Sequence, residues 1–259
     1  MTASPSSPLR ADDEDPRLRS AYERFLATVV GAQLGAWLPA RPATILDISR
    51  DDPTRGSRGL YRRMAANGHD VVRAIDVADL RRWPHPTSVP GIRHAAGDIR
   101  YLDWFRSSAL DGLVAEGSAL SSALATETTV EQAARLLRPG GRLLLSVDSL
   151  LYGLARLAEQ HRWPELADAN AGDVVLVPDA ADGYTRCFGA DELRDLVEAA
   201  GFRVDWVRPR TVIPPDVLTH ALSRDPSVFD ELVATELERA REREGEPLGL
   251  YLALSATRR

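Results

Sequence analysis

Acidic side chains that directly follow short apolar runs are the residues of this sequence best suited to chemistry. Asp76 follows such a run, and Asp98 and Ile99 stand together further along the chain. A carboxylate in the position of Asp76 can accept two hydrogen bonds from a ribose diol, each contributing about 1.5–3 kcal/mol when water is excluded. Asp98 can accept a hydrogen bond from the exocyclic amine of adenine, and Ile99 offers the ring an apolar wall. Residues of these types could therefore hold a nucleoside, but each acid also fits a solvated strand end or a helix N-cap.

The apolar runs that would position these acids alternate with helical stretches. This alternation predicts a parallel sheet covered by helices on both faces. In such a sheet, ligands bind beyond the carboxyl ends of the strands, where the strand order reverses. Seven strands are expected, over residues 44–48, 70–75, 92–95, 112–115, 142–147, 202–207 and 248–256.

The remaining segments frame this sheet within one domain, 17–259. Residues 1–16 are rich in Pro, Ser and Asp and have almost nothing to bury, so we expect a disordered tail. Apolar residues at three- and four-residue spacing predict a helix over 17–38. Residues 149–188 have a broken pattern that suggests a lid or insertion, and 225–244, dense in Glu and Arg, predicts a solvated helix.

Composition excludes several classes of protein. All 32 basic residues are arginines, as in the products of GC-rich actinobacterial genomes, and the absence of lysine excludes Walker-type phosphate binding and pyridoxal Schiff bases. The net charge of −6 argues against a nucleic-acid partner, and no apolar stretch or basic leader indicates a membrane span or signal peptide. We therefore expect a cytoplasmic protein, monomeric or homodimeric. No metal is expected, because the single cysteine and five histidines show no ligand spacing.

Four segments occur in an order that resembles the class I S-adenosylmethionine-dependent methyltransferases. They are Ile45-Leu46-Asp47, Ala74-Ile75-Asp76, Ala96-Gly97-Asp98-Ile99 and Leu137-Arg138-Pro139-Gly140-Gly141-Arg142-Leu143, with Leu193 and Ala200-Gly201-Phe202 downstream. The resemblance covers residues from about 20 to 259. It implies an α/β fold, with a Rossmann-like, seven-stranded, mostly parallel sheet whose last strand is antiparallel. It also implies S-adenosyl-L-methionine as the cofactor, with Asp47 at the glycine-rich loop, Asp76 at the ribose, and Asp98 and Ile99 at the adenine. Val77, which follows Asp76, is also expected at the cofactor.

The loop after Asp47 departs from this family. Where the family has glycines that let backbone amides approach the cofactor, the chain has Ser49 and Arg50, and Gly56 comes later as a substitute. The loop is also several residues longer than the usual form. Arg50 and Arg55 suit the cofactor carboxylate, but they suit Asp51 and Asp52 of their own loop equally well.

Catalysis of methyl transfer requires mainly an oriented acceptor and, for some acceptors, a base. Glu116, just beyond the fourth expected strand, is the first candidate to face the methyl donor, and His161 in the insertion is a candidate base. Plainer interpretations are that Glu116 is a hydrogen-bonded polar residue at the start of a loop and that His161 is an exposed histidine. Tyr22 could close over the cofactor or pack in the core. Other aromatic residues would line an apolar substrate pocket or pack the insertion: Trp83, Trp104, Tyr152, Trp163 and Tyr184.

Three functions are thus compatible with the sequence. The first is methyl transfer from S-adenosyl-L-methionine to a small-molecule acceptor. The second is a binding or scaffolding protein with a degenerate methyltransferase-like fold, which the missing glycines favour. The third is an NAD-dependent oxidoreductase, against which the missing Gly-x-Gly-x-x-Gly argues.

Overall fold

The computed structural model describes residues 16–77, 89–123, 125–169, 174–178, 183–246 and 248–259. Most of the expected tail, 1–16, lies outside these residues. The strands are β1 (Thr44–Asp47), β2 (Asp70–Asp76), β3 (Ile92–Gly97), β4 (Leu110–Ala115), β5 (Leu137–Ser149), β6 (Val174–Pro178), β7 (Tyr184–Phe188), β8 (Phe202–Arg210) and β9 (Tyr251–Arg258).

These strands form one mixed sheet. Strands β3, β2, β1, β4 and β5 are neighbours in that order and run parallel, and β9 pairs antiparallel with both β5 and β8. The expected α/β class with a mostly parallel sheet and an antiparallel last strand is confirmed. The order reverses between β1 and β4, so the crevice of such a sheet lies beyond the carboxyl ends of these two strands.

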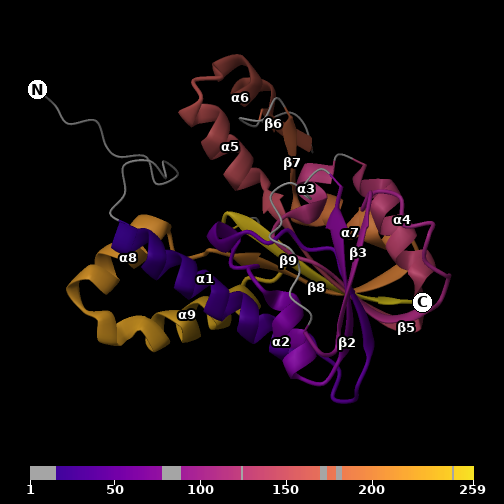
Figure 1. The fold of residues 1–259 in the computed structure, drawn as a ribbon. Helices are drawn as coiled ribbons and strands as arrows, with labels where there is room; N and C mark the ends of the chain where they lie inside the picture. Colours follow the sequence, from indigo (N-terminus) through magenta and orange to yellow (C-terminus); the bar gives the residue numbers. More distant parts are fainter. Residues whose placement is uncertain (1–15, 78–88, 124, 170–173, 179–182, 247) are drawn as a thin grey trace, which may run out of the picture.

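Helices cover both faces of the sheet (Figure 1). On one face, α1 (Pro16–Trp37) and α2 (Leu60–Ala66) pack on β1 and β2 through a buried cluster that includes Leu34 and Ile45. On the other face, α4 (Thr126–Leu136) and α7 (Ala190–Ala199) pack through Val130 and Leu193. Helix α1 lies where 17–38 was expected to be helical, and α7 ends before Gly201, whose φ of 94° only glycine adopts readily.

The insertion contains more regular structure than the sequence suggested. It holds α5 (Leu150–Glu159), α6 (Trp163–Ala169) and an antiparallel hairpin of β6 and β7, so the described sheet has nine strands rather than the seven expected. Figure 1 shows this segment projecting from the end of the sheet. It is attached there because two residues of β7 pair with two residues of β5. The run Val174-Val175-Leu176-Val177 favours a strand, but the polar residues on both sides of it obscured this signal.

The helix expected over 225–244 is shorter in the structure, where it begins at Phe229 and ends at Glu242. Helix α8 (Pro215–Arg224) ends at Asp225, whose side chain accepts the N–H of Ser227, and after a short turn α9 (Phe229–Glu242) begins. Helix α9 is not purely solvated, because Val233, Glu236 and Ala240 are buried in the fold. No helix in the described part of the chain is both long enough and apolar enough to span a bilayer.

Candidate functional site

Asp47, at the carboxyl end of β1, is buried and partly paired. Its Oδ1 accepts the N–H of Ser49 at 2.9 Å and lies 3.2 Å from Nη1 of Arg73. Its Oδ2 is also buried but has no hydrogen-bond partner within the described residues. This strand end therefore has one buried acceptor atom that the described residues leave unpaired.

The loop after β1 is bonded to the end of β4. The N–H of Arg50 donates to the carbonyl of Glu116 at 3.0 Å, and the N–H of Glu116 donates to Oγ of Ser49 at 2.9 Å. The hydroxyl of Ser57 donates to the carbonyl of Arg50 at 2.6 Å. Gly117 has a φ of 71°, and a Cβ at this position would lie 2.5 Å from Oγ of Ser57. Ser49 and Arg50 thus hydrogen-bond the loop after β1 to the loop after β4, across the point where the strand order reverses.

Gly56 brings the same loop onto α1. Its φ is 69°, and an added Cβ would lie 2.6 Å from the backbone carbon of Leu26. A side chain is therefore excluded by a contact between loop and helix. Its expected role at the cofactor stays a prediction.

Arg55 reaches from this loop to the carboxyl end of β5. Its Nη1 forms an ion pair with Asp148 and donates to Oγ of Ser118 at 2.9 Å. Its guanidinium carbon lies 5.4 Å from the ring centroid of Tyr152 and 5.2 Å from that of Tyr251. Burial alone would lower the pKa of Arg55, but the nearby Asp148 raises it above its usual range, so the guanidinium is permanently charged.

Glu116 is fully buried beyond β4 and is held by Arg210 of β8. The two guanidinium nitrogens donate to the two carboxylate oxygens at 2.7 and 3.0 Å, and Arg210 also binds Oε1 of Gln33 on α1. Burial by itself raises the pKa of Glu116, but Arg210 outweighs this effect and lowers it. Glu116 lies at the strand end where the sequence placed it, with a carboxylate that is already paired.

The residues expected at the ribose and adenine lie together at the ends of β2 and β3. Oδ2 of Asp76 accepts the N–H of Ile99 at 3.4 Å, and the N–H of Val77 donates to the carbonyl of Gly97 at 3.3 Å. Ile99 is buried, whereas Val77 is 53% exposed. Asp76 is thus placed beside an apolar side chain at the edge of the sheet.

Asp98 is engaged in its own turn. Its carboxylate accepts the backbone N–H of Arg100 at 2.9 Å and receives hydrogen bonds from the guanidinium of Arg100 at 2.6–3.1 Å. These bonds lower the pKa of Asp98. This capping of the turn is the plainer interpretation given above, and a contact of Asp98 with adenine stays a prediction.

His161 is exposed in the turn between α5 and α6. Its Nδ1 lies 3.0 Å from the carbonyl oxygen of Glu159, and its ring lies 5.8 Å from that of Trp163. Its expected role as a base stays a prediction. Tyr22 packs against a cluster formed by α1, α8 and α9, and Trp83 lies outside the described residues. Within those residues, no three His, Cys, Asp or Glu side chains form a group suited to a metal.

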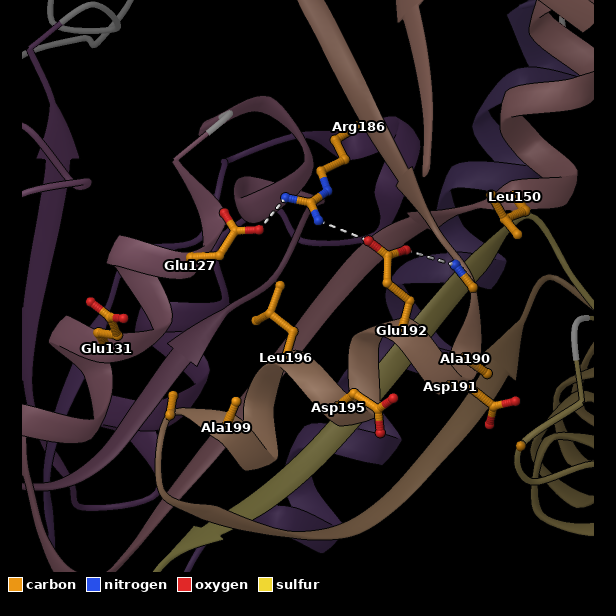
Figure 2. Close-up of a pocket in the computed structure, with 13 residues that line it drawn as sticks. Glu127, Glu131, Leu150, Arg186, Ala190, Asp191, Glu192, Asp195, Leu196 and Ala199 are labelled. Carbon is orange, nitrogen blue, oxygen red and sulfur yellow. Dashed lines mark hydrogen bonds and ion pairs between the residues drawn. The ribbon is translucent and has the colours of Figure 1, made fainter. Parts of the chain in front are cut away.

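A separate cavity of about 740 Å³ lies between α4 and α7 (Figure 2). Five of its thirteen lining residues are acidic, and Arg186 donates hydrogen bonds to two of them, Glu127 at 2.7 Å and Glu192 at 2.8 Å. None of the residues predicted to bind the cofactor or to catalyse the reaction lines this cavity.

Three residues of this region, Asp148, Tyr251 and Arg210, were not predicted from the sequence. Asp148 interrupts the apolar strand Leu143-Leu144-Leu145-Ser146-Val147, and a charged residue in a buried strand is a usable signal. Arg210 and Tyr251 carry no such signal, because their partners lie far away in the sequence. Arg55 was noted in the loop. It contacts Asp52 of that loop, at 3.4 Å, as well as Asp148.

The chain resembles known proteins in its fold rather than in its sequence. No protein-family model and no curated protein matches the sequence. Among solved structures, an S-adenosylmethionine-dependent methyltransferase from Methanosarcina mazei is 18% identical, with 87% of this chain and 96% of that one covered and a TM-score of 0.54. One from Mesorhizobium loti is 16% identical, with 88% and 96% covered and a TM-score of 0.56.

A third similar structure is the 1,6-didemethyltoxoflavin-N1-methyltransferase of Burkholderia thailandensis, which holds S-adenosylhomocysteine. It is 20% identical, with 93% of this chain and 79% of that one covered and a TM-score of 0.50. The chain therefore has the class I S-adenosylmethionine-dependent methyltransferase fold, as its sequence motifs predicted.

Proposed function

We propose that the chain binds S-adenosyl-L-methionine and transfers its methyl group to a small-molecule acceptor. The observation that carries this proposal is the placement of Asp76 beside Ile99 at the carboxyl ends of β2 and β3. In an open parallel sheet this edge is where nucleotide ligands bind. Support also comes from the solved structures with this fold, which include small-molecule methyltransferases.

The residues at the crevice fit such a cofactor chemically. Asp76 would accept the ribose hydroxyls, while Ile99 and Val77 would enclose the adenine. The unpartnered Oδ2 of Asp47, at the end of β1, would accept a hydrogen bond from the α-ammonium group. The bound cofactor supplies a methyl group already activated by its sulfonium.

The chain would then contribute mainly orientation. Holding an acceptor in line with the methyl group can supply about 7–11 kcal/mol of the barrier reduction. Arg210 fixes Glu116 and with it the end of β4, the strand next to the crevice. Glu116 is therefore proposed as a positioning residue that shapes the floor of the site and does not exchange protons during turnover.

The second candidate function, a binding protein without methyl transfer, is favoured by the joined loops. Ser49, Arg50 and Ser57 hold the β1 loop on the end of β4, and Arg55 brings a cation to the same edge. At an effective dielectric of about 20, a cation about 4 Å from the sulfonium would oppose its binding by roughly 4 kcal/mol before solvent and geometry are considered. S-adenosylhomocysteine, which lacks the sulfonium charge, would bind without this penalty.

Two measurements distinguish these functions. Thermal shift with S-adenosylmethionine, S-adenosylhomocysteine and NAD reports which ligand binds the native state, because such a ligand raises Tm. Incubation with methyl-deuterated S-adenosylmethionine and pools of amines, phenols and heterocycles, followed by mass spectrometry, reports transfer. The proposal expects both sulfur nucleosides to bind, NAD not to bind, and label to enter one acceptor. Binding without label transfer to any pool supports the second candidate, and no binding refutes both nucleoside functions.

A further inference from the structure

Asp148, Tyr152 and Tyr251 form a box around the guanidinium of Arg55, which we call the cation cage. Asp148 lies near the carboxyl end of β5 and is directly paired with Tyr251 of β9 in the antiparallel register. Tyr152 stands in the first turn of α5, where its N–H donates to Oγ of Ser149 at 3.1 Å. The two rings lie 6.0 Å apart. Each wall of the cage therefore comes from regular secondary structure rather than from a loop.

The chemistry of the cage is that of a site for an organic cation. Aromatic faces attract a cation through their quadrupole, and a buried carboxylate needs a positive partner. The Asp148 side chain is only 1% exposed, and Arg55 and Ser118 both donate to its Oδ1. Oδ2 has no hydrogen-bond partner within the described residues. Arg55 thus uses half of the carboxylate, whereas a guanidinium or ammonium group of a ligand can engage both oxygens.

Arg55 enters the cage from outside the sheet. It belongs to the loop after β1, it is flanked by Gly56 with a φ of 69°, and its side chain is 14% exposed. Its second acidic contact, Asp52, lies in the same loop at 3.4 Å. The three walls of the cage therefore do not belong to the loop that carries Arg55, and Asp52 is a second acidic partner of the guanidinium within that loop.

The cage is also separate from the nucleoside end of the site. The strand order β2-β1-β4-β5 puts three inter-strand spacings between Asp76 and Asp148. Neighbouring strands lie about 4.8 Å apart, which places the two carboxylates about 14 Å from each other along the sheet edge. A nucleoside bound at Asp76 would therefore not fill the cage, which lies at the other end of this edge, beyond β4.

We propose that the cation cage, in which Arg55 lies in this structure, is the subsite for a guanidinium or ammonium group of the methyl acceptor. The assignment to the acceptor rests on the proposed methyl transfer, whereas cation binding by the cage does not. The cofactor's sulfonium shares the same charge and is the rival occupant. Two tests are therefore needed. The first asks whether the cage binds a cation, and the second asks whether that cation comes from the acceptor or from the cofactor.

The first test removes Arg55 and supplies a small cation. Arg55→Ala should melt below the parent chain, and low-millimolar methylguanidinium should raise its Tm saturably by about 4 °C or more. Arg55→Ala/Asp148→Asn, which lacks the buried charge, is the matched control and should not respond beyond sodium chloride of equal ionic strength. An equal response of both variants, or no response of either, overturns the proposal.

Folding itself becomes the readout if Arg55→Ala does not fold. Methylguanidinium added during refolding should then restore its circular dichroism and a cooperative thermal transition, while the double variant should fold without it. Failure of methylguanidinium to restore the single variant, when the double variant folds, overturns the cage.

The second test identifies the source of the cation. Calorimetry on Arg55→Ala should show S-adenosylhomocysteine and methylguanidinium binding together, with the affinity ratio of S-adenosylmethionine to S-adenosylhomocysteine unchanged from the parent chain. A ratio that rises tenfold, with methylguanidinium displaced by S-adenosylmethionine, assigns the cage to the sulfonium and overturns the acceptor assignment. If methylguanidinium binds but neither nucleoside does, methyl transfer and the acceptor assignment both fail, and only a cation-binding cage remains.

Discussion

Arg210 binds both carboxylate oxygens of Glu116, at 2.7 and 3.0 Å, in a pair that is almost completely excluded from solvent. The two residues are 94 positions apart and join the end of β4 to the end of β8. Through Gln33, Arg210 also ties α1 to this junction. Glu116 was the first candidate to face the methyl donor, and this ion pair makes it part of the framework beneath the site.

Breaking this pair should be costly. Arg210→Met should lower the free energy of unfolding by about 3–5 kcal/mol, because it leaves a buried carboxylate without its partner. Urea denaturation measures this loss. Arg210→Met/Glu116→Leu should recover most of it, and Arg239→Ala, which removes one partner of an exposed helical pair with Glu242, should cost less than about 1 kcal/mol. A loss in Arg210→Met no larger than in Arg239→Ala would show that the pair does not hold the framework.

The contact between the β1 loop and the end of β4 should depend on Gly117. Gly117→Ala should destabilise the chain by about 2–5 kcal/mol, because a residue with positive φ is strained and its Cβ would also overlap Ser57. Gly140→Ala is the matched control, since Gly140 has a φ of 76° but nothing within 4 Å of the added Cβ. It should lose only the backbone strain, about 1–2 kcal/mol. Equal losses in urea denaturation would mean that the two loops are not in close contact.

Stability should fall as the solution is acidified through neutrality. His69 is buried, and burial lowers its pKa below the usual 6.5, so the unfolded chain takes up a proton before the folded chain does. The stability from neutral His69 is therefore complete above the unfolded pKa of about 6.5 and is lost as pH falls from there through the lower pKa of the folded chain. His69→Asn should reduce the slope of unfolding free energy between about pH 7.5 and 5.5. The exposed His161→Asn serves as control, and a slope unchanged in both variants would contradict burial of a neutral His69.

The single thiol should be inert in the folded chain. Cys187 is completely buried on β7, and burial raises its pKa, so almost no thiolate forms near neutral pH. Ellman's reagent should react with Cys187 only at the rate of unfolding, and fully in guanidinium chloride. Rapid labelling of the native chain would mean that the hairpin of β6 and β7 opens from β5.

The seven expected strands were predictable because each of them carries a local signal. The apolar runs at β1, β2 and β4 and the segment Arg138-Pro139-Gly140-Gly141 at the start of β5 are visible within a few residues, and the parallel order follows from their alternation with helices. The hairpin of β6 and β7 was missed because its short strands stand among polar residues. The site was less predictable, because ion pairs such as Arg55 with Asp148 join residues 93 positions apart. Only the folded chain shows which of several nearby acids an arginine reaches.

Binding of S-adenosylhomocysteine to the parent chain, Asp76→Asn and Asp70→Asn, measured by calorimetry, tests the account most directly. Both aspartates belong to β2, but Asp70 lies at its opposite end and pairs with the exposed Arg93. Loss of a charged acceptor for the ribose should weaken binding by about 10- to 150-fold in Asp76→Asn. Asp70→Asn should bind like the parent chain. If Asp76→Asn binds S-adenosylhomocysteine as tightly as the parent chain, or if the parent chain does not bind it, the proposed nucleoside site at β2 is wrong.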